Sequence, residues 1–292
     1  MAAVGECDTP AAGGCPSGAL PRTVGPVPVF DLSRRRRGAV RPSPIFLAFV
    51  ALAVLGAFLA WRDNSQGSRT ADFGVFVMVL AGWVVSLCLH EFAHAYAAYR
   101  AGDRSVEAAG YLTLNPFKYA HPLLSIVIPL FFIMQGGIGL PGGAVYLHRH
   151  AFRSRAMQSV AAAAGPATNV AFAVVTLVIV HAHANDASHV RFWTGLAFFG
   201  FLQITAAVLN LLPIPGLDGW AIIEPYVDPA TAQGAEKIKP WGMLGVIVLL
   251  QVSQLNAKFF DLVYGIYDLS GVNRVVPAIG HLFFKFWSNP PA

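Results

Sequence analysis

Long runs of apolar residues, separated by short polar stretches, dominate this sequence. Four runs have roughly the twenty residues that a helix needs to cross the hydrocarbon core of a bilayer. A weaker run, Trp241–Leu255, is also predicted to span, whereas the short aromatic segments after it favour the membrane surface. The pattern predicts an all-α polytopic membrane protein with about five to six transmembrane helices. The four long runs are Pro44–Trp61, Phe73–Tyr99, Met157–His183 and Phe192–Leu212.

One further apolar stretch, Pro122–Pro141, is as long as a span but is interrupted by a glutamine and three glycines. Such interruptions are typical of a re-entrant segment or hairpin that lines a protein cavity. Arginines precede it at Arg100 and Arg104 and follow it at Arg153 and Arg155. Because Lys and Arg mark cytoplasmic loops, we expect this stretch to begin and end on the cytoplasmic side.

Composition supports the membrane assignment and excludes an ordinary soluble domain. The chain is 55% hydrophobic and 12% charged, with a mean hydropathy of +0.56. Its net charge of +5 comes from basic residues dispersed along loops, which indicates membrane topology and no nucleic-acid partner. Three cysteines without a CxxC pair support neither a disulfide framework nor a cysteine zinc site.

The second apolar run contains the sequence HEFAH, with His90, Glu91 and His94 among aliphatic and aromatic residues. Residues four apart lie on one face of a helix, so the two imidazoles can point at one metal ion. In this HExxH arrangement two histidines bind zinc and the glutamate activates water. Histidines that merely form hydrogen bonds between packed helices are the alternative, but ionisable groups at membrane depth usually mark a functional site.

Asp218 is the third candidate metal ligand, and it lies in the sequence NLLPIPGLDGW after the run that ends at Leu212. Prolines and glycines break the helix there, as is tolerated at membrane depth only beside protein or a watery cavity. If Pro122–Pro141 crossed the membrane, Asp218 would lie a bilayer away from His94. If that stretch is re-entrant, both motifs lie at the cytoplasmic end, and Asp218 completes a three-ligand zinc site.

Three motifs make the sequence resemble the site-2 protease family of intramembrane zinc metalloproteases. They are HEFAH at 90–94, AGPATN at 164–169 and NLLPIPGLDG at 210–219, the last close to the family pattern NxxPxPxLDG. The resemblance covers residues 82–220 and points to a compact bacterial type without PDZ or CBS domains. The glycine, proline and asparagine of AGPATN are assigned to close packing beside the site.

The resemblance implies one zinc ion per chain, bound by His90, His94 and Asp218, with Glu91 as the catalytic base. Asn210 is expected to contact the substrate backbone or the developing oxyanion, for which a carboxamide donor is suitable. The alternative for Asn210 is a hydrogen bond between packed helices.

The expected organisation has three parts. Residues 1–43, rich in Gly, Pro and Ala and ending in an arginine cluster, are predicted to form a disordered cytoplasmic tail. Residues 44–270 are predicted to form the membrane-embedded metalloprotease domain. Residues 271–292 are predicted to form an amphipathic or interfacial C-terminal tail.

The expected function is zinc-dependent cleavage of a peptide bond in or near a transmembrane segment of a membrane-protein substrate. The expected surroundings are the lipid bilayer of a bacterial cell membrane, with the N-terminus and the active site toward the cytoplasm. Oligomeric state is left open. The alternatives are an inactive family member that binds membrane proteins and a metal-binding or transport protein.

Overall fold

The computed structural model describes residues 40–63, 65, 67–119 and 152–288, and every regular element in these ranges is helical. Short 3-10 turns join several of the α-helices. The α-helices are α1 (Pro44–Arg62), α2 (Arg69–Ala101), α3 (Ser105–Ala108), α5 (Arg155–Ala182), α6 (Val190–Asn210), α7 (Asp218–Ile223), α8 (Pro229–Ile238), α9 (Gly242–Gln251), α10 (Ser253–Asp268) and α11 (Val275–Phe284).

In the described part of the chain, four helices are long and apolar enough to cross a membrane. They are α1, α2, α5 and the stretch Ala187–Asn210, which contains α6. Each coincides with one of the four long apolar runs, so these four predictions are confirmed. The chain is therefore an integral membrane protein.

Polar caps determine where three of these helices begin. The hydroxyls of Ser43, Ser68 and Ser154 accept hydrogen bonds from backbone N–H groups in the first turns of α1, α2 and α5. The α2 helix ends at Ala101, and the capping residue Gly102 has a φ of 121°, a conformation that favours glycine. With 33 residues, α2 is about 50 Å long and extends beyond the hydrocarbon core.

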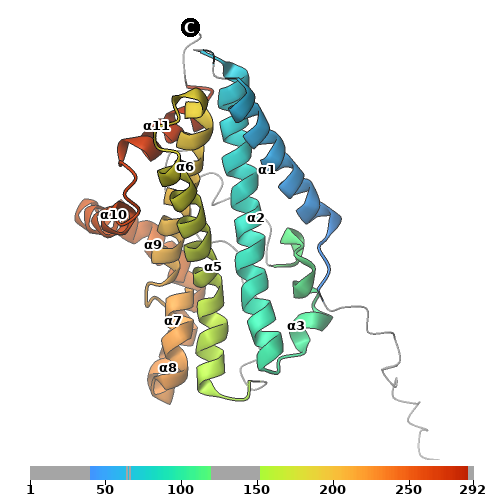
Figure 1. The fold of residues 1–292 in the computed structure, drawn as a ribbon. Coiled ribbons are helices and arrows are strands. Elements are labelled where there is room, and N and C mark those ends of the chain that lie inside the picture. The colour runs from blue at the N-terminus through green and yellow to red at the C-terminus, as the bar shows by residue number, and fades with distance from the viewer. Residues whose placement is uncertain (1–39, 64, 66, 120–151, 289–292) are drawn as a thin grey trace, which may run out of the picture. The chain divides into compact units, whose positions relative to one another are not determined.

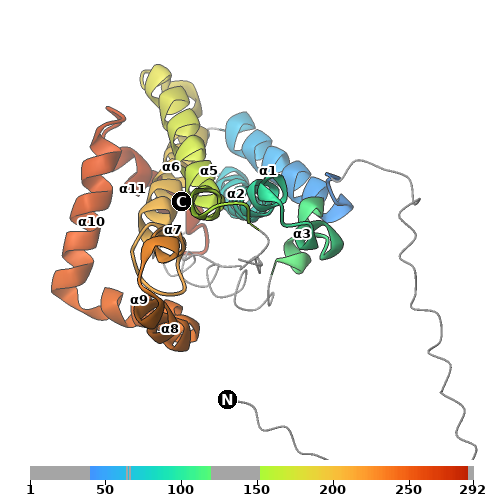
Figure 2. The same ribbon diagram turned by 90° about the horizontal axis from the view of Figure 1, so that it is seen from below.

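Helix α2 lies between α1 on one side and α5 and α6 on the other (Figures 1 and 2). In the most apolar part of each span, 89% of the residues are buried in the stretch that contains α6, whereas 17% are buried in α1. Helix α6 is thus an internal element, and α1 exposes most of its apolar surface, as a helix that faces lipid does.

Glycines allow α1 and α2 to approach backbone to backbone. A Cβ atom on Gly56 would lie 2.8 Å from the Gly74 carbonyl oxygen, and one on Gly74 would lie 2.6 Å from the Ala60 nitrogen. Small residues at such crossings are typical of membrane helices, where close van der Waals packing replaces the hydrophobic driving force. This contact holds the peripheral helix α1 against the helix that carries HEFAH.

The prediction of one spanning helix over Trp241–Leu255 is wrong. The chain divides there into α9 and α10, with Val252 in an extended conformation between them. The ten residues of α9 give a length of about 15 Å, half the thickness of the hydrocarbon core. Asn256 Nδ2 donates to the Leu250 carbonyl at 3.0 Å and so satisfies a backbone group freed by the break.

The stretch Pro122–Pro141, predicted to be re-entrant, lies outside the described residues, as do residues 1–39 of the predicted N-terminal tail. The end of α2 and the residues before α5 nevertheless meet at one end of the helices. The Arg153 amide donates to the Ala101 carbonyl at 3.4 Å, which joins the end of α2 to the start of α5 (Figure 1). The chain between them therefore begins and ends at the same end of the helices.

The C-terminal segment, predicted as an interfacial tail from residue 271, contains α11, which packs along α6. A Cβ atom on Gly280 would lie 3.0 Å from the Gly195 nitrogen and closer still to the Thr194 carbonyl. Phe284 is fully buried in a cluster with residues of α2 and α6. One face of α11 is therefore part of the core.

A buried ion pair joins α2 to α6 at the end opposite HEFAH. Arg191 Nε donates to Asp72 Oδ1 at 2.7 Å, and both residues are 6% exposed. We expect Asp72→Ala to lower the free energy of unfolding by about 3–5 kcal/mol, because it leaves a buried guanidinium without its partner.

Denaturant unfolding of the detergent-solubilised chain, followed by helical circular dichroism, measures this loss. The exposed pair Asp268–Arg274 provides the matched control, and Asp268→Ala should cost about 1 kcal/mol or less. Equal decreases in the free energy of unfolding of the two variants would show that the buried Asp72–Arg191 pair contributes no more to stability than the exposed pair.

Candidate metal centre

Helix α2 presents the two histidines of HEFAH on one face. His90 and His94 are 5% and 6% exposed, and their Nε2 atoms lie 3.0 Å apart. The separation follows from the four-residue spacing on a helix, as the sequence predicted. Two imidazole nitrogens therefore point at a common position inside the protein.

Asp218 reaches the same position from the other side. Helix α6 ends at Asn210, and the chain turns back through a loop in which Gly216 has a φ of 103°. Asp218 is the first residue of α7, and its carboxylate oxygens lie 3.2 Å from His90 Nε2 and 3.3 Å from His94 Nε2. The structure thus brings together the three residues predicted as metal ligands.

Helix α5 supplies hydrogen-bond partners for the outer nitrogens of both rings. His90 Nδ1 lies 2.5 Å from Asn169 Oδ1, and His94 Nδ1 lies 2.7 Å from the Ala161 carbonyl oxygen. Both oxygens are acceptors, so each Nδ1 carries the proton and each Nε2 keeps a lone pair for a metal ion. These partners could not be identified from the sequence, although Asn169 is a polar residue within an apolar span.

Gly165 of α5 leaves the space that the ligands face. A Cβ atom at this position would lie 2.5 Å from His90 Nε2 and closer still to His94 Nε2. Any side chain here would therefore occupy the point toward which the imidazoles are directed. The sequence assigned this glycine to close packing alone, but its backbone also lines the space between the two histidine rings.

These residues fit a catalytic zinc ion. One ligand atom from each of His90, His94 and Asp218 lies within 4.8 Å of the others, and among the described residues they form the group able to hold a metal. Two histidines and one carboxylate are a donor set of catalytic zinc, which leaves a coordination position open. The free thiol of Cys88 does not belong to the group.

Glu91 and Asn210 lie on the elements that carry the ligands. Glu91 follows His90 on α2 and is 3% exposed, so its carboxyl group is buried next to the metal-binding face. Asn210 is the last residue of α6 and is 5% exposed, at the start of the loop that leads to Asp218.

Close backbone contacts hold the loop that carries Asp218. A Cβ atom on Gly219 would overlap the Leu211 carbonyl, and one on Gly242 would overlap the Pro215 carbonyl. Ser159 Oγ of α5 also donates to the Ile222 carbonyl of α7 at 2.6 Å. Helix α7 is thus fixed to α5, the helix that also contacts both histidine rings.

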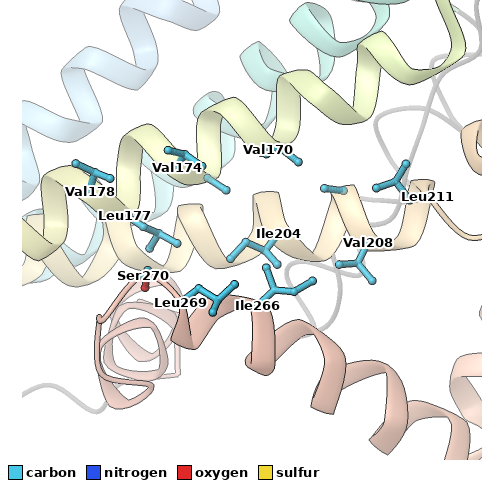
Figure 3. Close-up of a pocket in the computed structure, with 12 residues that line it drawn as sticks. Val170, Val174, Leu177, Val178, Ile204, Val208, Leu211, Ile266, Leu269 and Ser270 are labelled. Atoms are coloured by element: carbon cyan, nitrogen blue, oxygen red, sulfur yellow. The ribbon is translucent and has the colours of Figure 1, made fainter. Parts of the chain in front are cut away.

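A cavity of about 320 Å³ lies apart from this centre, between α5, α6 and the end of α10 (Figure 3). Aliphatic side chains line it, including Val174, Leu177 and Ile204, and the Ser270 hydroxyl is its polar side-chain group. None of the three candidate metal-binding residues lines it.

Comparison with known proteins places most of the chain among metalloproteases. "Putative zinc metalloprotease Rip2" of Mycolicibacterium smegmatis is 50% identical over 255 residues, 87% of this chain and 98% of that protein. The protein of the same name from Mycobacterium tuberculosis is 47% identical over 253 residues, 87% of this chain and 97% of its own. "Putative zinc metalloprotease YwhC" of Bacillus subtilis is 34% identical over 174 residues, 57% of this chain and 76% of that protein. No family model and no solved structure matches the chain.

Proposed function

Because the chain belongs to the site-2 protease family of zinc metalloproteases, we propose that it cleaves a peptide bond in or near a transmembrane segment of another membrane protein. The observation that carries this proposal is the meeting of His90, His94 and Asp218 between helices long enough to span a membrane. His90 and His94 are buried on α2, and Asp218 of α7 faces them.

The proposed chemistry divides the work among five side chains. His90, His94 and Asp218 would hold one zinc ion per chain, which when bound would supply Lewis-acid activation of water near neutral pH. Glu91 accepts a proton from the attacking water and returns it to the leaving amine. Asn210 donates a carboxamide hydrogen bond to the substrate backbone or to the oxyanion.

A helical substrate must unwind before this chemistry can occur. In a transmembrane helix each carbonyl accepts an intrahelical hydrogen bond, so the scissile carbonyl is neither exposed nor correctly oriented. Glycine, proline or polar residues near the cut reduce the cost of local unwinding. We therefore propose substrates with helix-weakening residues close to the cleaved bond.

The proposed orientation places the site toward the cytoplasm. Arg100 lies in the last turn of α2 and Arg104 follows that helix. Arg153 precedes α5 and Arg155 is its first residue, at the end of the helices where the two chain segments meet. Basic residues favour the cytoplasmic side, and the arginines of residues 34–37 add to that preference at the N-terminus. Cleavage would then release a cytoplasmic fragment.

Metal removal tests the proposed function. We expect the purified chain, reconstituted with a labelled single-span substrate that has a glycine-rich centre, to cleave it and to lose cleavage after dialysis against a chelator. Stoichiometric zinc should restore it, because the three ligands supply one site. Gel analysis of the fragments and elemental analysis of the protein measure the two quantities. Cleavage that survives complete metal loss would exclude the proposed mechanism.

A further inference from the structure

A chain of buried polar side chains extends from the metal centre through three spanning helices. Ser86 on α2, Gln203 on α6 and Asn169 on α5 are 1%, 0% and 4% exposed. Ser86 Oγ donates to the Trp83 carbonyl at 2.8 Å, and Gln203 Nε2 donates to Ser86 Oγ at 2.9 Å. Asn169 Nδ2 donates to Gln203 Oε1 at 2.8 Å, and Asn169 Oδ1 faces His90 Nδ1. The carboxamide groups link the helices in series.

The Trp83 carbonyl, at the end of this series of hydrogen bonds away from His90, determines the direction of each of them. The Trp83 carbonyl can only accept, so the Ser86 hydroxyl uses its proton there and accepts from Gln203. The Gln203 NH₂ group therefore faces Ser86, and its oxygen faces Asn169. Asn169 in turn directs its own NH₂ group at Gln203.

This order places the Asn169 oxygen against the His90 ring. A carboxamide rotated by half a turn would present an N–H group to His90 Nδ1 and would favour the ring form with its proton on Nε2. That proton would occupy the position of the lone pair needed for the metal ion. The orientation of one buried amide thus determines whether His90 can act as a ligand.

We infer that Gln203 is a positioning residue that keeps His90 in its metal-binding form by fixing the orientation of Asn169. The inference rests on the proposed function, because it assigns His90 to a metal ion. Gln203 does not touch the metal-binding atoms and acts through Asn169. Partners of this kind orient metal ligands, and their loss typically weakens metal binding by roughly 10–100-fold.

Zinc affinity of the full chain in detergent, measured by competition with a chromophoric chelator, tests the inference without any proteolysis assay. We expect Gln203→Met to weaken zinc binding about tenfold. This is the lower end of the range for residues that orient metal ligands, because Gln203 contacts His90 only through Asn169. Thr205→Val is the matched control. Thr205 is also fully buried on α6, and its hydroxyl donates to the Phe201 carbonyl of the same helix at 2.9 Å. It should leave zinc affinity unchanged.

Measuring the effect of Gln203→Met in an Asn169→Asp variant as well distinguishes a positioning role of Gln203 from a role in packing alone. In Asn169→Asp a carboxylate accepts from His90 in either orientation, so Gln203→Met should no longer weaken zinc binding in the double variant. A packing role would cost the same in both backgrounds. Equal affinity of Gln203→Met and the wild type, or an equal loss with and without Asn169→Asp, would overturn the inference. If Gln203→Met does not fold, Ser86→Ala removes the acceptor for the Gln203 amide and should act in the same direction.

The outcomes distinguish this inference from the proposed function. A wild-type chain that binds no zinc would overturn both. A wild-type chain that binds zinc and cleaves its substrate, with a Gln203→Met variant of the same affinity, would overturn the role of Gln203 alone.

Discussion

Replacing Gly165 with alanine is expected to abolish zinc binding and cleavage together. The added methyl group would lie 2.5 Å from His90 Nε2 and even closer to His94 Nε2, where neither ring can move without losing its Nδ1 hydrogen bond to α5. Alanine is the better helix former, so the backbone of α5 is not the source of the loss. Elemental analysis and the reconstituted cleavage assay measure the two effects.

Gly265→Ala is the matched control for this substitution. Gly265 lies within α10, and a Cβ atom there would meet nothing within 4 Å. We expect this variant to retain zinc and activity and to be as stable as the wild type or slightly more stable. Full zinc occupancy in Gly165→Ala would show that the ion does not lie between the two histidine rings and α5.

The candidate ligands could be predicted from the sequence. The two histidines are close in the sequence on one helix, and the predicted membrane topology places Asp218 at the same end of the helices. The four-residue spacing of His90 and His94 fixes their common face on any helix. Asp218 is 124 residues beyond His94 in the chain, and basic residues near the helix ends were enough to place it at the same end. The structure confirms this convergence at distances of 3.2 and 3.3 Å.

The supporting contacts could not be predicted in the same way. Asn169, Gln203 and Ser86 are single polar residues in three apolar helices, and each helix can rotate about its axis without changing its hydropathy. Which polar groups meet depends on packing details such as the Gly165 contact with the ligand rings. The sequence indicates that these residues need partners but does not identify them.

Hydropathy also failed to predict where one helix ends. The segment Trp241–Leu255 is apolar on average, but Gln251 and Ser253 lie on either side of the break at Val252. Averaging over the segment hides a local break of this kind. Capping residues are more informative, since Ser68 explains why α2 begins at Arg69, before the predicted start at Phe73.

Glu91→Gln is expected to retain zinc and to lose at least a hundredfold in cleavage rate, and it separates an active protease from a family member that only binds membrane proteins. The amide has nearly the same size as the carboxyl group but cannot accept a proton from water, and general acid–base catalysis contributes about 10²–10⁴-fold. His90, His94 and Asp218 are unchanged, so elemental analysis should find the wild-type zinc content.

Glu107→Gln provides the control for this substitution, since Glu107 is an exposed residue of α3 and its variant should cleave at the wild-type rate. The single-turnover rate with excess enzyme is the measurement to make, because it reports the chemical step without product release. An unchanged rate in Glu91→Gln would remove the buried carboxylate from the mechanism. A rate that falls together with zinc content would instead assign Glu91 to metal retention, since loss of the base alone leaves the three ligands intact.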